Sequence, residues 1–418
     1  MDRLISLLGL LVLIALAWLV SSHKRVWNWR VIVGGVLLQL LIAVIMLRTP
    51  PGEWLFSGVE SFFDQLSAWV EEGSGFLFHI YPADGVAAAQ APPRRTLLWT
   101  FAFNALPTII FFSSLMAVLY HVGVMQLVVR GMAWVMQFTL GASGAESLAA
   151  AANVFVGHTE APLVIRPFIA RMTRSELNAM MVGGFSTISG GLLAAYHSMG
   201  INAGHLVTAS VISAPAALVI AKVMQPETET PETRGSVSVS IPRKSANVLE
   251  AAAVGASDGM KLAINVAAML IAFLAMIAML NSLVGMIGGW FGMTWTIEAG
   301  LGYLFAPLAW LMGIPGQDCL KAGELLGLKT VANEFIAYDA LGDIEIGDAA
   351  GQISQRSQYI LTYALSGFSN FAAIGIQIGG IGGLEPERRG DLARLGLRAM
   401  FGGLLACCMT ACIAGVLI

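Results

Sequence analysis

Eight long runs without acidic or basic residues dominate this sequence and restrict what it can fold into. Each run is long enough to cross the roughly 30 Å apolar core of a bilayer as a helix. Of the 418 residues, 57% are hydrophobic and only 12% are charged, a composition too apolar for soluble domains. We expect an all-α, multi-pass membrane protein whose eight transmembrane helices lie at residues 4–20, 31–47, 96–120, 177–196, 200–221, 262–297, 357–384 and 399–418.

Basic residues between these runs predict the orientation of the chain. The positive-inside rule places all of their clusters in the cytoplasm, and eight alternating spans then put both termini outside. The acidic segments 53–84 and 339–348 fall on the outer face. We expect Met1–Ser22 to form a retained first helix and not a cleaved signal peptide. The four clusters are Lys24, Arg25 and Arg30; Arg166, Arg171 and Arg174; Lys222, Arg234, Arg243 and Lys244; and Arg388, Arg389, Arg394 and Arg398.

Two polar clusters occur inside apolar segments, and the pair repeats. Residues 152–155 read A-N-V-F and residues 332–335 read A-N-E-F, an offset of 180. Residues 184–187 read G-F-S-T and residues 367–370 read G-F-S-N, an offset of 183. In membrane proteins, polar groups at two symmetry-related places mark substrate and ion sites at a repeat interface. We therefore predict an inverted internal repeat.

The first cluster of each pair lies on a stretch too short to span. A capping box of Ser143 and Glu146 begins a helix of about twelve residues, which reaches roughly to the middle of the bilayer. Gly157 then breaks the helix, and Pro162 suits the first turn of a returning arm. We predict a re-entrant helical hairpin here, and a second one at 317–340 whose tip carries A-N-E-F.

The second cluster of each pair interrupts a span. A capping box of Thr173 and Glu176 begins the fourth span, which then contains four glycines and three hydroxyl residues at 183–191. The seventh span is similarly rich in glycine at 367–380. Such residues allow close helix packing, or they mark local unwinding that exposes carbonyl groups to a cation. Facing the hairpin tips, they favour unwinding.

Carboxylates in the middle of the bilayer indicate function because they are costly. Glu160 and Glu334 each cost about 2.5 to 3.5 kcal/mol on insertion scales. Buried acids with internal partners and no ligand are the alternative. Amides also join helices, so Asn153, Asn333 and Asn370 have a purely structural alternative as well.

Three segments carry a resemblance to a known family: A-A-A-N-V-F-V-G-H-T-E-A-P at 150–162, G-L-K-T-V-A-N-E-F-I-A-Y at 327–338, and G-F-S-N at 367–370. They resemble the signatures of the concentrative nucleoside transporters in their short bacterial form. The resemblance covers essentially the whole chain, including interfacial helices. It implies a sodium-coupled importer in the bacterial inner membrane, a homotrimer without cofactors, with regions at 1–95, 96–224, 225–246 (a flexible cytoplasmic linker) and 247–418.

The resemblance also implies how the site works. One nucleoside would lie between the two hairpins and the unwound helices, and a hairpin-containing unit would move against a scaffold of spans three and six. Oxygen ligands suit a hard cation such as sodium. The implied substrate residues are Gly157, His158, Thr159, Glu160, Leu192, Glu334, Phe368 and Asn370, and the implied sodium ligands are Asn153, the Val156 carbonyl, Thr187 and the Ile188 carbonyl.

Two positions depart from the family pattern. The family commonly has Gln where this chain has His158, which leaves the base preference open, because neutral imidazole has one donor and one acceptor in fixed directions. Ala373 stands where relatives often have a serine that contacts ribose. One sugar hydrogen bond is then missing or supplied by water.

Other functions fit the residues less well. A nucleotide would call for a cluster of Arg or Lys. Lys329 is the one candidate near the tips, and we expect it to pair with an acid such as Glu324. Proton coupling is the alternative to sodium. An intramembrane hydrolase built on His158 and Glu160 lacks a third metal ligand, so we expect no enzyme. A channel would conduct without a coupled gradient.

Overall fold

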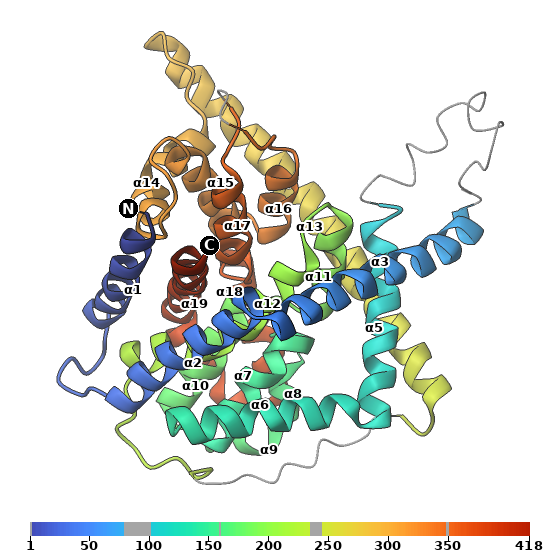
Figure 1. Ribbon diagram of the computed structural model, residues 1–418. Coiled ribbons are helices and arrows are strands. Elements are labelled where there is room, and N and C mark those ends of the chain that lie inside the picture. The colour runs from blue at the N-terminus through green and yellow to red at the C-terminus, as the bar shows by residue number, and fades with distance from the viewer. Residues whose placement is uncertain (1, 79–101, 159, 235–244, 348–350) are drawn as a thin grey trace.

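Helices make up most of the computed structural model, which describes residues 2–78, 102–158, 160–234, 245–347 and 351–418 (Figure 1). The first part of the chain forms α1 (Asp2–Leu19), α2 (Trp29–Arg48), α3 (Pro50–Phe78), α5 (Ala105–Val122), α6 (Val124–Leu140), α7 (Gly144–Val156), α8 (Ala161–Val164), α9 (Arg166–Ile169), α10 (Arg174–Ser186), α11 (Gly190–Ser198) and α12 (Ala203–Met224). The rest forms α13 (Val248–Trp290), α14 (Ile297–Leu311), α15 (Cys319–Val331), α16 (Glu334–Gly342), α17 (Gln355–Leu365), α18 (Phe371–Leu384) and α19 (Arg389–Leu417).

Seven of the eight predicted runs coincide with helical segments of spanning length. These segments are 2–19, 29–48, 105–122, 174–198, 203–224, 248–290 and 386–417. The remaining run, 357–384, is not a continuous helix, because α17 ends at Leu365 and α18 begins at Phe371. A break was predicted in this run and in the fourth, where α10 ends at Ser186 and α11 begins at Gly190, and both breaks are present. The start predicted at residue 96 lies outside the described residues.

The first predicted hairpin contains the expected break. The Ser143 amide donates to Glu146 at 2.8 Å, which completes the capping box at the start of α7. The helix ends at Gly157, whose φ of +80° is a conformation that residues with a Cβ rarely adopt. Pro162 stands in the first turn of α8, which packs back on α7. The helix thus breaks where the sequence predicted, and the re-entrant hairpin itself stays a prediction.

The second predicted hairpin breaks at its polar cluster. Here α15 ends at Val331 and α16 begins at Glu334, with the Asn333 side chain accepting a hydrogen bond from the Ile336 amide at 3.0 Å. We call α7–α11 (residues 144–198) the first half and α15–α18 (residues 319–384) the second half. Each half contains a broken helix pair and an interrupted helix, and in the first half the short helix α9 lies between them.

The two interrupted helices meet at their breaks. A Cβ added to Gly367 would lie 2.8 Å from the Ser186 carbonyl carbon and 2.9 Å from the Phe185 carbonyl oxygen. No side chain fits between backbones this close, so glycine is required there. The polar clusters of the two halves therefore lie next to each other in the centre of the molecule.

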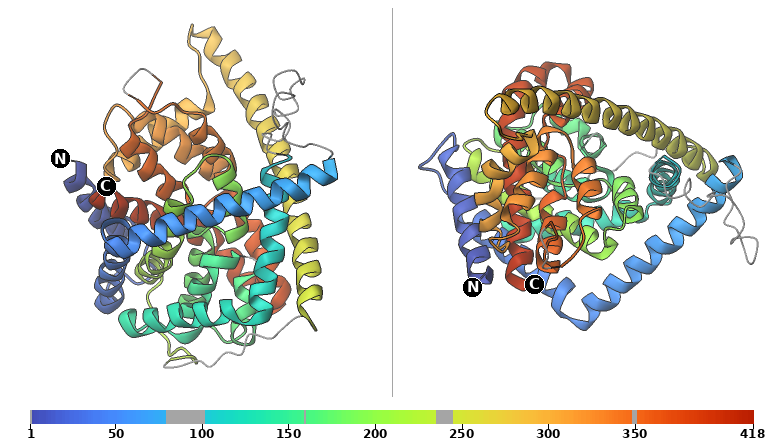
Figure 2. Two further views of the ribbon diagram at one scale, coloured as in Figure 1. Left: turned by 45° about the vertical axis from the view of Figure 1, so that its right-hand side comes forward. Right: turned by 90° about the horizontal axis from the view of Figure 1, so that it is seen from above.

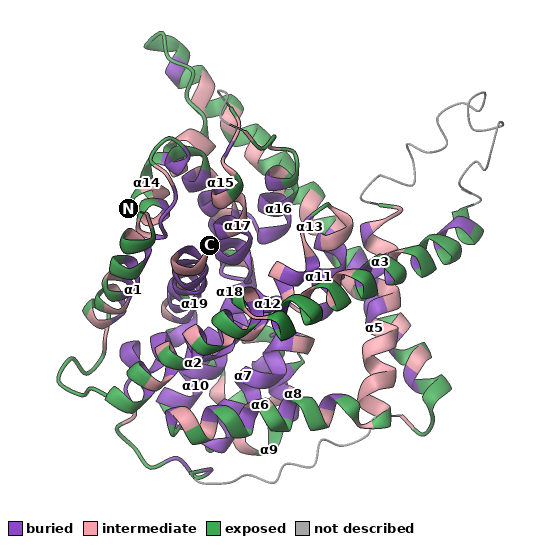
Figure 3. Ribbon diagram, in the orientation of Figure 1, coloured by how far each residue is buried: buried purple, intermediate pink, exposed green. Residues whose placement is uncertain are grey.

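Burial divides the helices into a core and a periphery. Figure 3 shows α10, α12 and α19 largely buried, whereas much of α1, α3 and α13 is exposed. The exposed faces are apolar, as on Leu4, Ile271 and Trp290. Apolar surface of this extent suits a lipid environment. At one edge α13 packs along α5, forming a pair that lies beside the first half (Figures 1 and 2).

The basic clusters meet at one end of the molecule. Arg388 donates to the Ala170 and Met172 carbonyls, and Arg398 donates to the carbonyls of Val20 and Met224. These contacts join all four predicted clusters. At the opposite ends of α1 and α19, Arg3 donates to the Ile418 carbonyl at 2.8 Å, so the two termini are adjacent (Figure 2). Which of these ends faces the cytoplasm stays a prediction.

The first part of the predicted linker, residues 225–234, is hydrogen-bonded to the starts of α7 and α10. The Thr233 carbonyl accepts a hydrogen bond from the Gly144 amide at 2.9 Å, and the Thr233 hydroxyl bonds Glu176 at 3.3 Å. Glu227 accepts a hydrogen bond from the Thr173 hydroxyl at 2.9 Å. The expectation of flexibility is therefore wrong for residues 225–234, because they satisfy the polar groups at the starts of α7 and α10. Residues 235–244 lie outside the described residues.

Candidate functional site

Glu334 is the most constrained acid of the site. It is buried, and it is the first residue of α16. One carboxylate oxygen accepts from the Tyr196 hydroxyl at 3.1 Å, and the other accepts from the Asn370 amide at 3.0 Å. Asn370 is fixed in turn, because its own oxygen accepts from the Ala373 amide at 2.8 Å. Each carboxylate oxygen has lone pairs left to accept from a ligand hydroxyl.

His158 follows Gly157 directly after the break in α7. Its ring is buried and lies edge-on to Phe368, with ring centroids 4.6 Å apart and planes at 70°. Neither ring nitrogen has a hydrogen-bond partner in the described part of the chain. Buried polar groups are normally satisfied, so a ligand is the natural partner for this ring. Thr159, also predicted to contact substrate, lies outside the described residues.

The predicted sodium ligands come from the ends of two helices that pack together, α7 and α10. The Asn153 side chain is buried, and its amide oxygen has no partner among the described residues. The Thr187 hydroxyl donates to the Gly183 carbonyl at 2.9 Å, which leaves its oxygen free to accept or to ligate. Ile188 is fully buried in the break, and Val156 is the last residue of α7. This all-oxygen set fits a hard cation.

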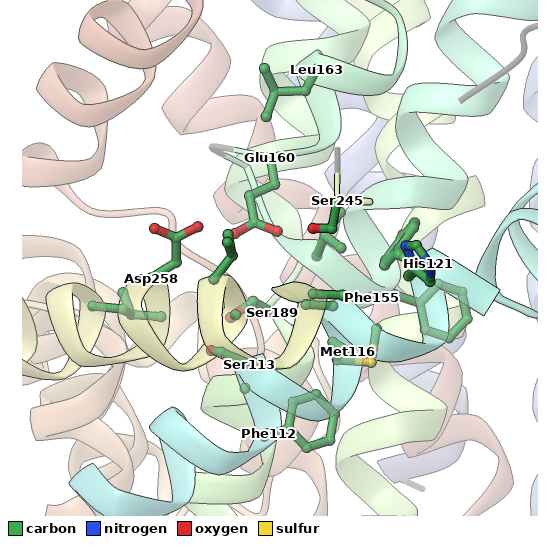
Figure 4. A pocket seen from close by; sticks show the side chains of 18 of the residues that line it. Phe112, Ser113, Met116, His121, Phe155, Glu160, Leu163, Ser189, Ser245 and Asp258 are labelled. Atoms are coloured by element: carbon green, nitrogen blue, oxygen red, sulfur yellow. The ribbon is translucent and has the colours of Figure 1, made fainter. Parts of the chain in front are cut away.

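Glu160 differs from what the sequence predicted. It is exposed, not buried, so it does not carry the full desolvation cost that its sequence position suggested. It lines a cavity of about 200 Å³ between the α5–α13 pair and the first half (Figure 4). Asp258 on α13 lies across from it, and Ser113 on α5 and Ser189 in the α10–α11 break complete this part of the wall.

The cavity connects the break in the first half with the basic end of the molecule. It extends from Phe155, Val156 and Gly191 to Ser245, which precedes α13. Leu192 is buried at the start of α11 and is not part of the lining. The predicted residues thus divide into a buried group around Glu334 and His158 and an exposed acid in the cavity.

Two buried residues of the site were missed by sequence reasoning. Tyr196 donates to Glu334 from 138 positions away, and nothing in an uncharged run distinguishes such a tyrosine. The Gln377 amide donates to the Met181 carbonyl at 3.2 Å, while its oxygen has no partner in the described residues. A Cβ on Gly184 would lie 2.7 Å from the Gln377 nitrogen and 2.6 Å from the His158 Cβ. The sequence feature that could have identified Gln377 was its amide side chain within an apolar run.

The expected partner of Lys329 was wrong. Glu324 pairs with Lys321 at 3.0 Å, because the two lie three positions apart on one face of α15. Lys329 is instead fully buried, and its ammonium donates to the Ala364 carbonyl at 2.8 Å.

Family models match most of the chain. The Na⁺ dependent nucleoside transporter N-terminus matches residues 8–80, its C-terminus matches residues 205–415, and a nucleoside recognition model matches residues 102–203 between them. The chain belongs to the sodium-dependent nucleoside transporter family. This assignment confirms the resemblance in the sequence. Members of the family are transporters and not enzymes, so the hydrolase alternative is excluded.

Relatives of this transporter-family chain occur in bacteria and animals. An uncharacterized transporter of Haemophilus influenzae is 42% identical over the whole chain and 98% of its own length. The uncharacterized transporter YutK of Bacillus subtilis is 42% identical, with both chains fully covered. Sodium/nucleoside cotransporter 1 of Rattus norvegicus is 40% identical, and the chain spans 64% of its length.

Solved structures of CNTnw share the fold of this family member. CNTnw in an inward-facing, substrate-bound state is 42% identical, with a TM-score of 0.91 over 100% of this chain and 98% of that one. A CNTnw variant in an outward-facing state also gives 0.91 over the same shares. The same fold is therefore found in both the inward-facing and the outward-facing state.

Proposed function

We propose that this protein is a sodium-coupled nucleoside importer of the bacterial inner membrane. The observation that carries the proposal is the pairing of Glu334 with Asn370 in the second half, next to the unpartnered ring of His158 in the first. We call Glu334 and Asn370 the sugar half-site and Gly157 and His158 the base half-site. Ribose hydroxyls donate well to a carboxylate, whereas phosphates would be repelled by it. A nucleoside bridges the two half-sites.

Sodium is the coupling ion in this proposal. The unpartnered Asn153 oxygen, the Thr187 hydroxyl and the carbonyls at the ends of α7 and α10 supply oxygen ligands at the point where two helix C-termini converge. Helix C-termini carry partial negative charge, which favours a cation. Moving one charge through 100 mV supplies about 2.3 kcal/mol. A single sodium is sufficient for concentrative uptake.

Transport proceeds by alternating access, with both hairpins re-entrant and moving together with α10–α11 and α17–α18. The α5–α13 pair is the fixed scaffold and carries the contacts of a homotrimer. The cavity between this pair and the first half extends to the basic end. With that end in the cytoplasm and both termini outside, the arrangement is inward-facing.

Uptake of labelled uridine and adenosine into proteoliposomes tests the coupling. We expect concentrative uptake with an inward sodium gradient and none when choline replaces sodium at fixed pH. Uptake that persists in choline and follows a proton gradient would establish the proton-coupled alternative. Passive equilibration of substrate without any gradient dependence would indicate a channel.

A cross-link tests the moving unit. A Cβ on Gly191 would lie 3.7 Å from the Ser113 Oγ, so side chains at these two positions would be in contact. The double variant Ser113→Cys/Gly191→Cys should stop uptake when oxidised and recover on reduction, while nucleoside binding persists. Full uptake by completely oxidised protein would contradict the moving unit. The single variants are the matched controls.

A further inference from the structure

The two halves satisfy equivalent backbone carbonyls in different ways. Met181 in α10 and Ala364 in α17 are related by the offset of 183 that relates the two interrupted spans. The Met181 carbonyl accepts from the neutral Gln377 amide at 3.2 Å. The Ala364 carbonyl accepts from the Lys329 ammonium at 2.8 Å. A positive charge is therefore built into the second half at a place where the first half has none.

Lys329 lies where two helix ends converge. It is in the last turn of α15, and its acceptor Ala364 is the penultimate residue of α17. The C-terminal ends of helices carry partial negative charge, so both ends attract the ammonium. The side chain is fully buried, an environment in which an uncompensated charge is strongly unfavourable.

Glu334 lies at the start of α16, just after the end of α15. The Lys329 ammonium attracts the Glu334 carboxylate electrostatically, although no direct ion pair joins them in the described residues. Lys222, the other deeply buried lysine, differs because it contacts Glu146 directly at 2.7 Å. Lys329 therefore has a backbone carbonyl at the end of α17 as its hydrogen-bond partner instead of an acid.

The first half has the same convergence of helix ends without a built-in cation. There α7 and α10 end around Asn153, Val156 and Thr187, the ligands proposed for sodium. The Asn153 oxygen lacks a partner in the described residues, whereas both Glu334 oxygens have theirs. A mobile cation in one half thus corresponds to an ammonium attached to the chain in the other.

We propose that Lys329 is a positioning residue for the sugar half-site: its ammonium is a built-in cation that holds together the ends of α15 and α17, the helices that lead into Glu334 and Asn370. The sugar half-site is then assembled without an ion, whereas the base half-site requires sodium. This inference rests on the proposed function, in which Glu334 and Asn370 bind the sugar.

Lys329→Met tests the proposal because it keeps the length of the side chain and removes the charge. Binding of a ribonucleoside and its 3′-deoxy analogue is measured at saturating sodium. We expect ribonucleoside affinity to fall about tenfold or more, the analogue to lose less, and the half-saturating sodium concentration to change less than about twofold. Unchanged discrimination between the two ligands would overturn the proposal.

Gln377→Met is the matched control, since it removes the corresponding hydrogen bond to α10 without removing a charge. It should leave the ribose-to-deoxy discrimination intact and raise the half-saturating sodium concentration. If Gln377→Met reduced the discrimination as strongly as Lys329→Met does, charge at Lys329 would not be the cause and the proposal would fail.

The double variant Lys329→Met/Glu334→Gln tests whether Lys329 acts through Glu334 or only supports the structure. If Lys329 acts through Glu334, the double variant binds like Glu334→Gln alone, and it regains thermal stability if Lys329→Met folds poorly. Additive losses, or no recovery of folding, would overturn the proposal. If Glu334→Gln itself leaves the discrimination unchanged, the proposed sugar site fails instead.

Discussion

Each half contains a broken helix pair and an interrupted helix, yet the two halves differ in how far their polar groups are satisfied. In the second half, Glu334 and Asn370 bond each other and their neighbours. In the first half, the Asn153 oxygen and both His158 nitrogens have no partner among the described residues. The polar groups around Glu334 are therefore satisfied within the protein, whereas the Asn153 oxygen and the His158 ring are not. In the proposed function, the sodium ion and the nucleoside would supply the partners that the first half lacks.

Among the substitutions that test the first half, Asn153→Leu is expected to have the largest effect. The substitution removes the unpartnered amide oxygen while keeping similar volume, and we expect sodium-driven uptake to be abolished at physiological sodium. Loss of a residue that holds a metal ligand in place typically lowers the affinity for the metal ion by about 10- to 100-fold. Sodium titration of nucleoside binding is the measurement.

Gln39→Leu is the matched control for this substitution. Gln39 is also a buried amide, and its oxygen also lacks a partner among the described residues, but it lies on α2 and bonds Gly35. We expect transport to be retained. Equal loss of sodium dependence in both variants would show a general packing effect and remove the support for the ion site.

Glu334→Gln tests the sugar half-site in the second half. The new NH₂ group would face the donor of Tyr196 or Asn370, so a buried hydrogen bond is lost. The cost is about 1.5 to 3 kcal/mol for a charged acceptor, or roughly 10- to 150-fold in affinity. Calorimetric binding of ribonucleosides and of their 2′- and 3′-deoxy analogues measures it. An unchanged ranking of these ligands would contradict the sugar role.

Tyr196→Phe, a substitution on α11 of the first half, tests the environment of Glu334 with a smaller change. It removes one of two hydrogen bonds to Glu334 and leaves the ring against Phe335 and Tyr338. We expect a loss of about 0.5 to 1.5 kcal/mol in ribonucleoside binding, with the half-saturating sodium concentration unchanged. A sodium effect equal to the substrate effect would mean that Tyr196 does not belong to the sugar half-site alone.

His158→Gln is expected to have the smallest effect on total uptake and the clearest effect on base preference. An amide can donate and accept from one end, whereas the two nitrogens of imidazole point in different directions. We expect the ratio of uridine to adenosine affinity to change by about threefold or more. Competition of each nucleoside against one labelled substrate measures the ratio, and an unchanged ratio would assign base reading to other residues.

The sequence was informative wherever a polar residue interrupted an apolar run. Capping boxes at Ser143 and Thr173 predicted two helix starts, because they depend on residues only three positions apart. Asn153 and Glu334 were identifiable because polar groups are costly in such segments. These are local features, and local features can be read along the chain.

The rest depends on contacts between distant parts of the chain. The hydrogen bond between Tyr196 and Glu334, the acceptor of Lys329 and the contact of Gln377 with α10 all join different helices. Glu160 was expected to be buried because the cavity that exposes it exists only between α5, α13 and the first half. Sequence pattern alone does not determine which side chains meet across such an interface.

Binding of a ribonucleoside to the purified protein, compared in sodium and in choline, tests the central claim most directly. If sodium organises the first half, the nucleoside binds about tenfold or more tightly in sodium, and it tightens sodium binding by the same factor, because coupling between two ligands is reciprocal. Equal nucleoside affinity in sodium and choline, in protein that still binds the nucleoside, would contradict the account.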